Sequence, residues 1–221
     1  MGKRKYGEKG FKILDYINLS ILAIFIPTFF VVSITPGMCM TLSLSMGMSI
    51  GIKKTMFMMY GELLGVGLVA SASVVGVAAI MLQYPAIFMV LKYAGGAYLC
   101  YLGISMWLSR GKMSLKVDEC SFNVSKKNLA IQGFVTAIAN PKGWAFFIAL
   151  LPPFIDKSLP FAPQLSVLIL FILLLEFSCL LIYASGGMTL RKLLQNSSNV
   201  KLLNKIAGTM MIAIGVWLAL G

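Results

Sequence analysis

The sequence predicts an all-α, polytopic membrane protein whose six transmembrane helices form two inverted three-helix repeats, each with a broken first helix. The first observation is composition: the 221-residue chain is 59% hydrophobic and 12% charged, whereas soluble domains carry about a quarter charged residues. The second is that uncharged runs, such as the one between Asp15 and Lys53, exceed the roughly 20 residues that cross a bilayer core. The third is that a proline and a lone glutamate recur at matching places in the two halves of the chain.

Six apolar segments define the expected spans, at about residues 18–50, 55–82, 86–108, 129–155, 164–188 and 203–220. The first is longer than one span and has Pro36 and Gly37 in its middle. The last is short, so we expect it to include residues 202–205, with Lys205 reaching to the membrane surface. The chain therefore divides into a basic N-terminal tail (1–17), a first three-helix repeat (18–108), a basic loop (109–128) and a second three-helix repeat (129–221).

Basic residues in the short loops predict the orientation, because cytoplasmic loops of membrane proteins are enriched in Lys and Arg. The loops after spans two and four, together with the C-terminus, hold only Lys157. The loop 109–128 is therefore expected in the cytoplasm and both chain ends outside. The side of the membrane on which the N-terminal tail lies stays open, because the tail's own basic residues favour the opposite orientation. We expect the tail to be retained, because the apolar run that follows it is too long for a signal peptide. Eleven basic residues follow spans one, three and five: Lys53, Lys54, Arg110, Lys112, Lys116, Lys126, Lys127, Arg191, Lys192, Lys201 and Lys205.

The matching interruptions are "ITPGM" in the first span and "ANPKG" in the fourth. A proline inside a helix frees backbone groups, and these are tolerated at membrane depth only where protein or a wet cavity meets them. Paired interruptions in corresponding spans are typical of a transporter's central site, although a single one would be read as a harmless kink. The candidate substrate-binding or helix-break residues are Thr35, Pro36, Gly37, Asn140, Pro141 and Lys142.

Two lone acidic residues follow the interruptions, Glu62 in the second span and Glu176 in the fifth. A carboxylate at mid-membrane costs about 2.5–3.5 kcal/mol on insertion scales, which makes each a candidate functional residue. We interpret both as proton-coupling candidates, the alternative being protonated residues that are hydrogen-bonded within the structure. Gly61 and Gly65 are four residues apart and allow another helix to pack closely, so Glu62 is expected to face protein rather than lipid.

Lys142 has three interpretations: it pairs with a glutamate, it binds an anionic group of a substrate, or its stem reaches to the membrane surface. The chain contains no histidine, and its four cysteines lack metal-ligand spacing. We therefore expect no metal, no cofactor and no catalytic residue. The net charge of +12 follows from the basic loops, so nucleic acid is not an expected partner, and the expected partners are the lipid bilayer and a small molecule.

Four segments resemble the LysE/RhtB superfamily of amino-acid exporters, and one of them, "NKIAGTMMIAIGVWLAL", is similar to the last span of that family. "TPGMCMTLSLSMGMSIGIKKTMFMMYGELLG" is similar to the opening of that family, which has a Pro-Gly-Pro-type break and a Gly-x-x-x-Gly second span. "LKYAGGAYLCYLGISMWLS" is similar to its third span. "GFVTAIANPKGWAFFIALLPPFI" is similar to its strongest signature, in which Gly-Phe is followed by Asn-Pro-Lys.

The resemblance implies a six-span permease of the inner membrane that exports small amino acids or close analogues, is driven by an ion or proton gradient, and is not an enzyme. It also implies that Pro36, Gly37, the Asn140–Lys142 segment and Glu176 are the polar elements of the membrane interior. The chain departs from the family at Met38 and Cys39, where a proline and an asparagine are usual, and at Glu62, where a neutral residue is common. Glycine-rich faces would allow a homodimer.

Two other functions stay open on sequence alone. A membrane thiol–disulfide carrier would use a cysteine near the proline of each broken span, and Cys39 is three residues after Pro36. The fourth span, however, has no cysteine at the matching place. A passive channel or structural membrane subunit would show no dependence of substrate flux on the proton gradient.

Overall fold

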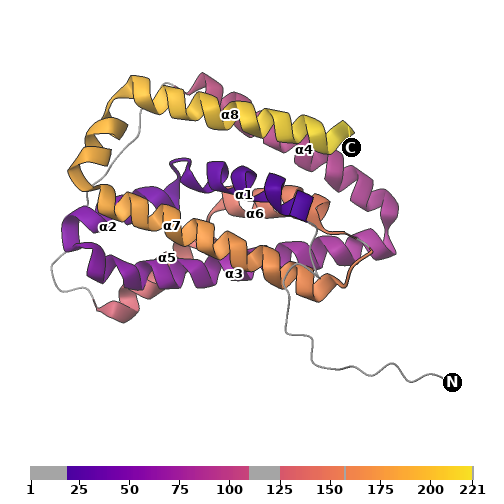
Figure 1. Cartoon of the computed structure of the whole chain (residues 1–221), viewed down its shortest axis with the longest axis horizontal. Coiled ribbons are helices and arrows are strands. Elements are labelled where there is room, and N and C mark those ends of the chain that lie inside the picture. Colours follow the sequence, from indigo (N-terminus) through magenta and orange to yellow (C-terminus); the bar gives the residue numbers. More distant parts are fainter. Residues whose placement is uncertain (1–18, 110–124, 157, 221) are drawn as a thin grey trace.

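A computed structural model describes residues 19–109, 125–156 and 158–220, and these residues are almost entirely helical (Figure 1). The predicted all-α membrane class is confirmed. The basic tail (1–17), residues 110–124 of the loop and Lys157 lie outside the described residues. The elements are α1 (Leu19–Ile34), α2 (Met38–Ile50), α3 (Ile52–Gln83), α4 (Pro85–Leu108), α5 (Lys126–Ile138), α6 (Pro141–Leu150), the 3-10 helix η2 (Pro152–Phe154), α7 (Phe161–Gln195) and α8 (Ser197–Leu220).

Both predicted helix breaks are present. The axes of α1 and α2 are bent by 59° around Pro36 and Gly37, and those of α5 and α6 by 53° around Asn140. Pro141 occupies the first turn of α6, where its missing amide hydrogen costs nothing and its fixed φ suits the helix. Pro27, by contrast, lies inside α1 without ending it.

Five candidate membrane spans lie within the described residues. Three are single helices, α3, α7 and α8, and each bent pair supplies one more. The expected third span corresponds to α4, which is not among these candidates. The chain is therefore a multi-pass membrane protein, while the count of six spans and the inverted relation of the two repeats stay predictions.

Each bent pair packs against the long helix of the other half of the chain. The helices α1 and α2 contact α7, whereas α5 and α6 contact α3. The remaining long helices, α4 and α8, lie side by side and form a separate layer (Figure 1). The two halves thus exchange their broken helices, which brings both breaks to the middle of the bundle.

Glycines set the closest helix contacts. A Cβ at Gly61 would collide with the carbonyl oxygen of Ala130, and one at Gly133 with that of Met58, so α3 and α5 touch backbone to backbone. This confirms that the glycine pair at residues 61 and 65 lies against another helix. In the second layer a Cβ at Gly103 would lie 2.6 Å from the carbonyl oxygen of Gly208, and close contact of this kind is how membrane helices associate.

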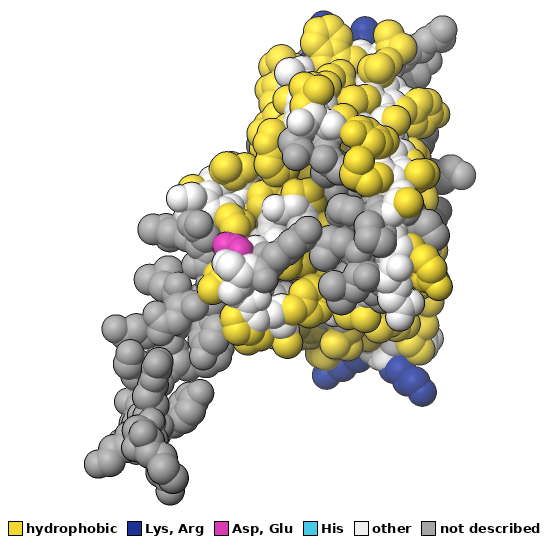
Figure 2. Space-filling model, turned by 90° about the vertical axis from the view of Figure 1, so that its right-hand side faces the viewer, with side chains coloured by type: hydrophobic (Ala, Val, Ile, Leu, Met, Phe, Trp, Pro, Cys, Tyr) yellow, Lys and Arg dark blue, Asp and Glu magenta, His cyan; other side chains and the backbone are white. Residues whose placement is uncertain are grey.

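Most of the described basic residues gather at one end of the bundle, because α3, α5 and α8 begin there and α7 ends there; Lys142 in the central cavity and Lys92 on α4 are exceptions. Figure 2 looks onto the opposite end, where most side chains are hydrophobic and Lys and Arg appear only at the edges of the view. This charge distribution is of the kind that the positive-inside rule describes, and the cytoplasmic position of the basic end stays a prediction.

Candidate functional site

Two separate apolar cores leave room for polar groups between them. On α3 the buried residues Met58 and Met59 belong to one core and Val66–Val74 to the other. On α7 the division falls between Ile172 and Cys179. Glu62 and Glu176 stand in these two gaps, at the same level as the two helix breaks.

A cavity lined by residues from both halves of the chain lies at this level, and its empty space of about 630 Å³ includes open solvent at its mouth. Six of the eight candidate residues line it: Thr35, Gly37, Glu62, Asn140, Lys142 and Glu176. The two prolines do not line it and act on the backbone alone. The apolar part of the wall consists mainly of Phe29, Val66, Val69, Phe146, Phe147 and Ile172.

At the first break, the carbonyl groups that end α1 receive donors from side chains. The Thr35 hydroxyl donates to the oxygen of Val31 at 2.6 Å, and the Tyr183 hydroxyl of α7 donates to that of Ile34 at 2.8 Å. Lys142 Nζ donates to the oxygen of Val32 at 3.1 Å. The break is therefore satisfied by Thr35 at the break itself and by Lys142 and Tyr183 from the other half of the chain, as buried backbone requires.

At the second break, Asn140 caps α6. Its side-chain oxygen accepts the backbone amide of Lys142 at 3.2 Å, the usual role of asparagine before a helix. Its Nδ2 donates to Cys39 Sγ at 3.7 Å, and Trp144 Nε1 donates to the carbonyl oxygen of Ile138 at 2.8 Å. Asn140 thus joins the two breaks, since Cys39 belongs to α2.

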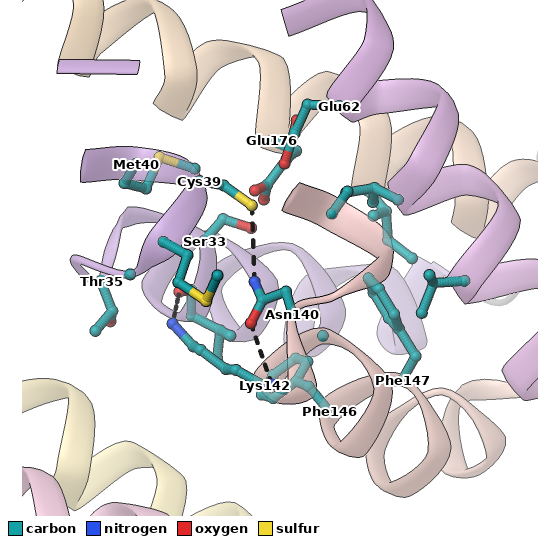
Figure 3. Close-up of a pocket in the computed structure, with 18 of the residues that line it drawn as sticks. Ser33, Thr35, Cys39, Met40, Glu62, Asn140, Lys142, Phe146, Phe147 and Glu176 are labelled. Carbon is teal, nitrogen blue, oxygen red and sulfur yellow. Dashed lines mark hydrogen bonds between the residues drawn. The ribbon is translucent and has the colours of Figure 1, made fainter. Parts of the chain in front are cut away.

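Lys142 does not reach the membrane surface. Its ammonium group lies in the cavity, bonded to Val32 and attracted by Glu176 (Figure 3). The first turn of α2 has no side-chain cap, and a Cβ at Gly37, its N-terminal neighbour, would lie 3.9 Å from Lys142 Nζ. A helix N-terminus and a cation at one place attract a negatively charged group.

The carboxyl groups of Glu62 and Glu176 lie close together and point toward one another (Figure 3). Glu176 lies near the Ser33 hydroxyl and is attracted by Lys142. Glu62 is fully buried, with an exposed fraction of 0%. Cys39 and Glu176 are its polar neighbours, but within the described residues neither of its oxygens has a partner in regular hydrogen-bond geometry.

Sequence reasoning missed Ser33, Trp144 and Tyr183. Tyr183 is seven residues after Glu176, two helical turns along the same face, which is a signal that could have identified it. Nothing local marks Ser33 or Trp144, because their roles depend on where the broken backbone lies. In the described part of the chain no three His, Cys, Asp or Glu side chains come together as metal ligands.

The chain matches the family described as LysE type translocator over residues 30–221. It is 26% identical over 203 residues to an uncharacterized membrane protein of Vibrio cholerae, covering 92% of this chain and 98% of that one. It is 29% identical over 132 residues to a homoserine/homoserine lactone efflux protein of Salmonella typhi, covering 60% of this chain and 63% of that one. It is also 26% identical over 216 residues to a leucine efflux protein of Klebsiella pneumoniae, covering 95% and 96%.

No solved structure matches the chain. The family match spans both helix breaks, both glutamates and all of α2 to α8. It confirms the resemblance carried by the Asn-Pro-Lys segment. The chain belongs to the LysE type translocator family.

Proposed function

We propose that this translocator is a secondary exporter of amino acids or close analogues across the inner membrane, coupled to the proton gradient. The observation that carries the proposal is the cavity between the two helix breaks, which holds Glu62, Glu176 and Lys142 at mid-bundle. Charged groups at this depth are costly and are characteristic of substrate and proton pathways.

The wall of the cavity matches a small amphiphile. Lys142 and the uncapped start of α2 suit a carboxylate, while the phenylalanine and valine side chains suit an apolar substituent. Relatives carry the names homoserine/homoserine lactone efflux protein and leucine efflux protein. Homoserine, its lactone and leucine all have a primary amino group beside a carbonyl carbon, and a substrate of that kind fits here.

In the proposed cycle, substrate enters from the cytoplasm between the two bent pairs. Glu176, together with Glu62, exchanges protons with the outside as the two halves move relative to each other. The cavity is reached from both halves of the chain, so a relative movement of the halves would change the side to which it opens, as in other transporters with repeated halves.

Cys39 gives little support to a thiol–disulfide carrier. Its sulfur lies against the Asn140 amide rather than against a second thiol, and a dithiol relay needs two. Export that survives the change Cys39→Ser would dispose of that function.

The test is transport by the full chain in proteoliposomes, with labelled leucine and homoserine as probes, with and without an uncoupler. We expect uphill transport that the uncoupler abolishes, and we expect Glu176→Gln to abolish it as well while leaving expression intact. Asp156→Asn is the matched control: the hydroxyl and amide of Ser158 lower the pKa of the Asp156 carboxyl, so this change also removes one negative charge, but outside the cavity. Flux that ignores the gradient would indicate a passive channel, and undiminished uphill transport by Glu176→Gln would exclude its proton role.

A further inference from the structure

The charges that face the cavity are unbalanced. The cavity is lined by Glu62 of α3, Glu176 of α7 and Lys142 of α6. The other titratable group is the thiol of Cys39 on α2, whereas α1 contributes the hydroxyl of Ser33 and the break after α1 that of Thr35. Two carboxylates therefore share one cation, and that cation also serves the backbone of Val32.

Of the two, Glu62 is the carboxylate without a cation of its own. Ser33 and Lys142 lie near Glu176, whereas the polar neighbours of Glu62 are the Cys39 thiol and the Glu176 carboxyl, and its buried oxygens have no partner in regular hydrogen-bond geometry within the described residues. A buried charge without a partner is strongly disfavoured, and two carboxylates at close range cannot both stay ionised. The pair therefore requires one positive charge between its members, as a proton or as a bound cation.

We propose that the ammonium group of the substrate is that cation: it binds between Glu62 and Glu176 in place of a single proton that the two carboxyl groups hold when the site is empty. The proposal rests on the exporter function proposed above and narrows its substrate class to primary amines. No covalent bond of the substrate changes. One proton leaves the carboxyl pair for water, and one ammonium group replaces it, so the charge between the carboxyl groups is conserved.

Three structural points support this arrangement. An ammonium group has three donors, enough to serve both carboxylates at once. The opposite side of the cavity, with Lys142 and the start of α2, remains available for the substrate's carboxylate. A proton and an ammonium group cannot occupy the same place between the two carboxyl groups. Binding of one therefore requires release of the other, and the exchange needs no separate proton site.

The substrate class follows from which end of the molecule is indispensable. The amino group is bound by two buried carboxylates, whereas the carboxylate meets one lysine that already has a backbone partner. An amide or lactone that keeps the amino group should therefore still bind. An N-acetyl derivative, which has no ammonium group, should not.

The experiment uses the purified full chain near neutral pH and two sets of probes: leucine, leucinamide and N-acetylleucine; and homoserine, homoserine lactone and N-acetylhomoserine. Binding is measured by calorimetry, and proton release is measured in weak buffer. We expect the free amines to bind with release of close to one proton each. The N-acetyl derivatives should bind at least about tenfold more weakly, because they lose charge-assisted hydrogen bonds.

The variant Glu62→Gln tests the ammonium-binding position between Glu62 and Glu176 separately from the rest of the cavity. It preserves size and removes one carboxylate, so we expect amine binding to weaken and proton release to fall close to zero. The control Asp156→Asn should release the same proton as the parent chain.

The outcomes distinguish this proposal from the exporter function. Two results would overturn the proposed ammonium site and leave the exporter function standing. One is that N-acetyl derivatives bind as tightly as the free amino acids, and the other is that Glu62→Gln releases as many protons as the parent chain. Failure of all six compounds to bind would contradict both.

Discussion

Lys142 shows how one side chain can connect the two halves of this molecule. Its backbone amide is capped by Asn140 at the second break, while its ammonium group donates to Val32 at the first. The same ammonium group is attracted by Glu176. A lysine that is neutralised by one carboxylate and held by one carbonyl can still attract a substrate anion, but its position depends on both contacts.

We therefore expect Lys142→Met to impair both binding and stability. The change leaves the Val32 carbonyl without its donor and Glu176 without its cation, and an unsatisfied buried acceptor costs about 1–3 kcal/mol. The measurements are KM for leucine or homoserine transport and the melting temperature in detergent. Lys201→Met, which changes an exposed lysine of α8, is the control. A wild-type KM in the Lys142 variant would show that this ammonium group does not contact substrate.

At the scale of single elements, the close contact between α3 and α5 depends on glycines, which have no side chain. Gly61 and Gly133 each lie against the backbone of the opposite helix, so even a methyl group would push the helices apart. Gly76, on the same helix α3, has no atom within 4 Å of its would-be Cβ. The chain thus supplies a matched pair of glycines, one constrained and one free.

We expect Gly133→Ala to lower the melting temperature markedly, because overpacking costs about 1–3 kcal/mol or more. Gly76→Ala should leave it unchanged or raise it, because alanine favours a helix over glycine by about 1 kcal/mol. Thermal unfolding in detergent, followed by size-exclusion fluorescence, compares the two. Equal stability of both variants would mean that α3 and α5 are not in backbone contact.

The connection from η2 to α7 is held by one buried amide side chain. Gln164 Nε2 donates to the carbonyl oxygens of Asp156, Leu159 and Pro160, and its Oε1 accepts the amide of Asp156. Gln164 is fully buried, with an exposed fraction of 0%. A hydrophobic replacement would remove all four of these hydrogen bonds, although the Asp156 carbonyl oxygen would keep the backbone amide of Leu159 as a donor.

Gln164→Leu should therefore loosen this connection and destabilise the fold by about 2 kcal/mol or more. Gln132→Leu, on the exposed face of α5, should have little effect. Limited proteolysis and the melting temperature report the difference. Protection equal to that of the parent chain in the Gln164 variant would contradict this role.

The breaks and the charged residues of the site could be predicted from the sequence, whereas their partners could not. Pro36, Pro141, Glu62 and Glu176 are conspicuous in an apolar chain, because lipid excludes what they introduce. The donors from Tyr183 and Trp144 are ordinary residues whose role appears only when a broken backbone lies beside them. The same holds for the pairing of α4 with α8.

Gly187 illustrates a feature that the sequence alone does not resolve. The pair at residues 186–187 is most simply interpreted as a packing contact. Gly186 does lie close to Leu190, but Gly187 has φ of 45° and ψ of −134° and has no neighbour within 4 Å of its would-be Cβ. It kinks α7 through a conformation that other residues rarely adopt, which the sequence of a glycine pair does not distinguish from packing.

For the whole molecule, the distribution of charge predicts an orientation that can be tested. The start of α5 lies at the basic end, and the start of α7 lies one span further along the chain, at the other end. In a background without native cysteines, we expect a membrane-impermeant maleimide to label Ser158→Cys in intact cells. Lys127→Cys should be labelled only after the cells are opened. The reverse pattern would place the basic loops outside and would favour the orientation indicated by the N-terminal tail.

The exchange of broken helices between the halves also has a consequence for synthesis. The carbonyl of Val32 finds its donor 110 residues later, at Lys142, and that of Ile34 finds its donor 149 residues later, at Tyr183. When the first half leaves the ribosome and enters the membrane, these groups and Glu62 have yet to meet the helices that will surround them. We therefore expect the newly synthesised first half to be incompletely folded in the membrane until the second half packs against it.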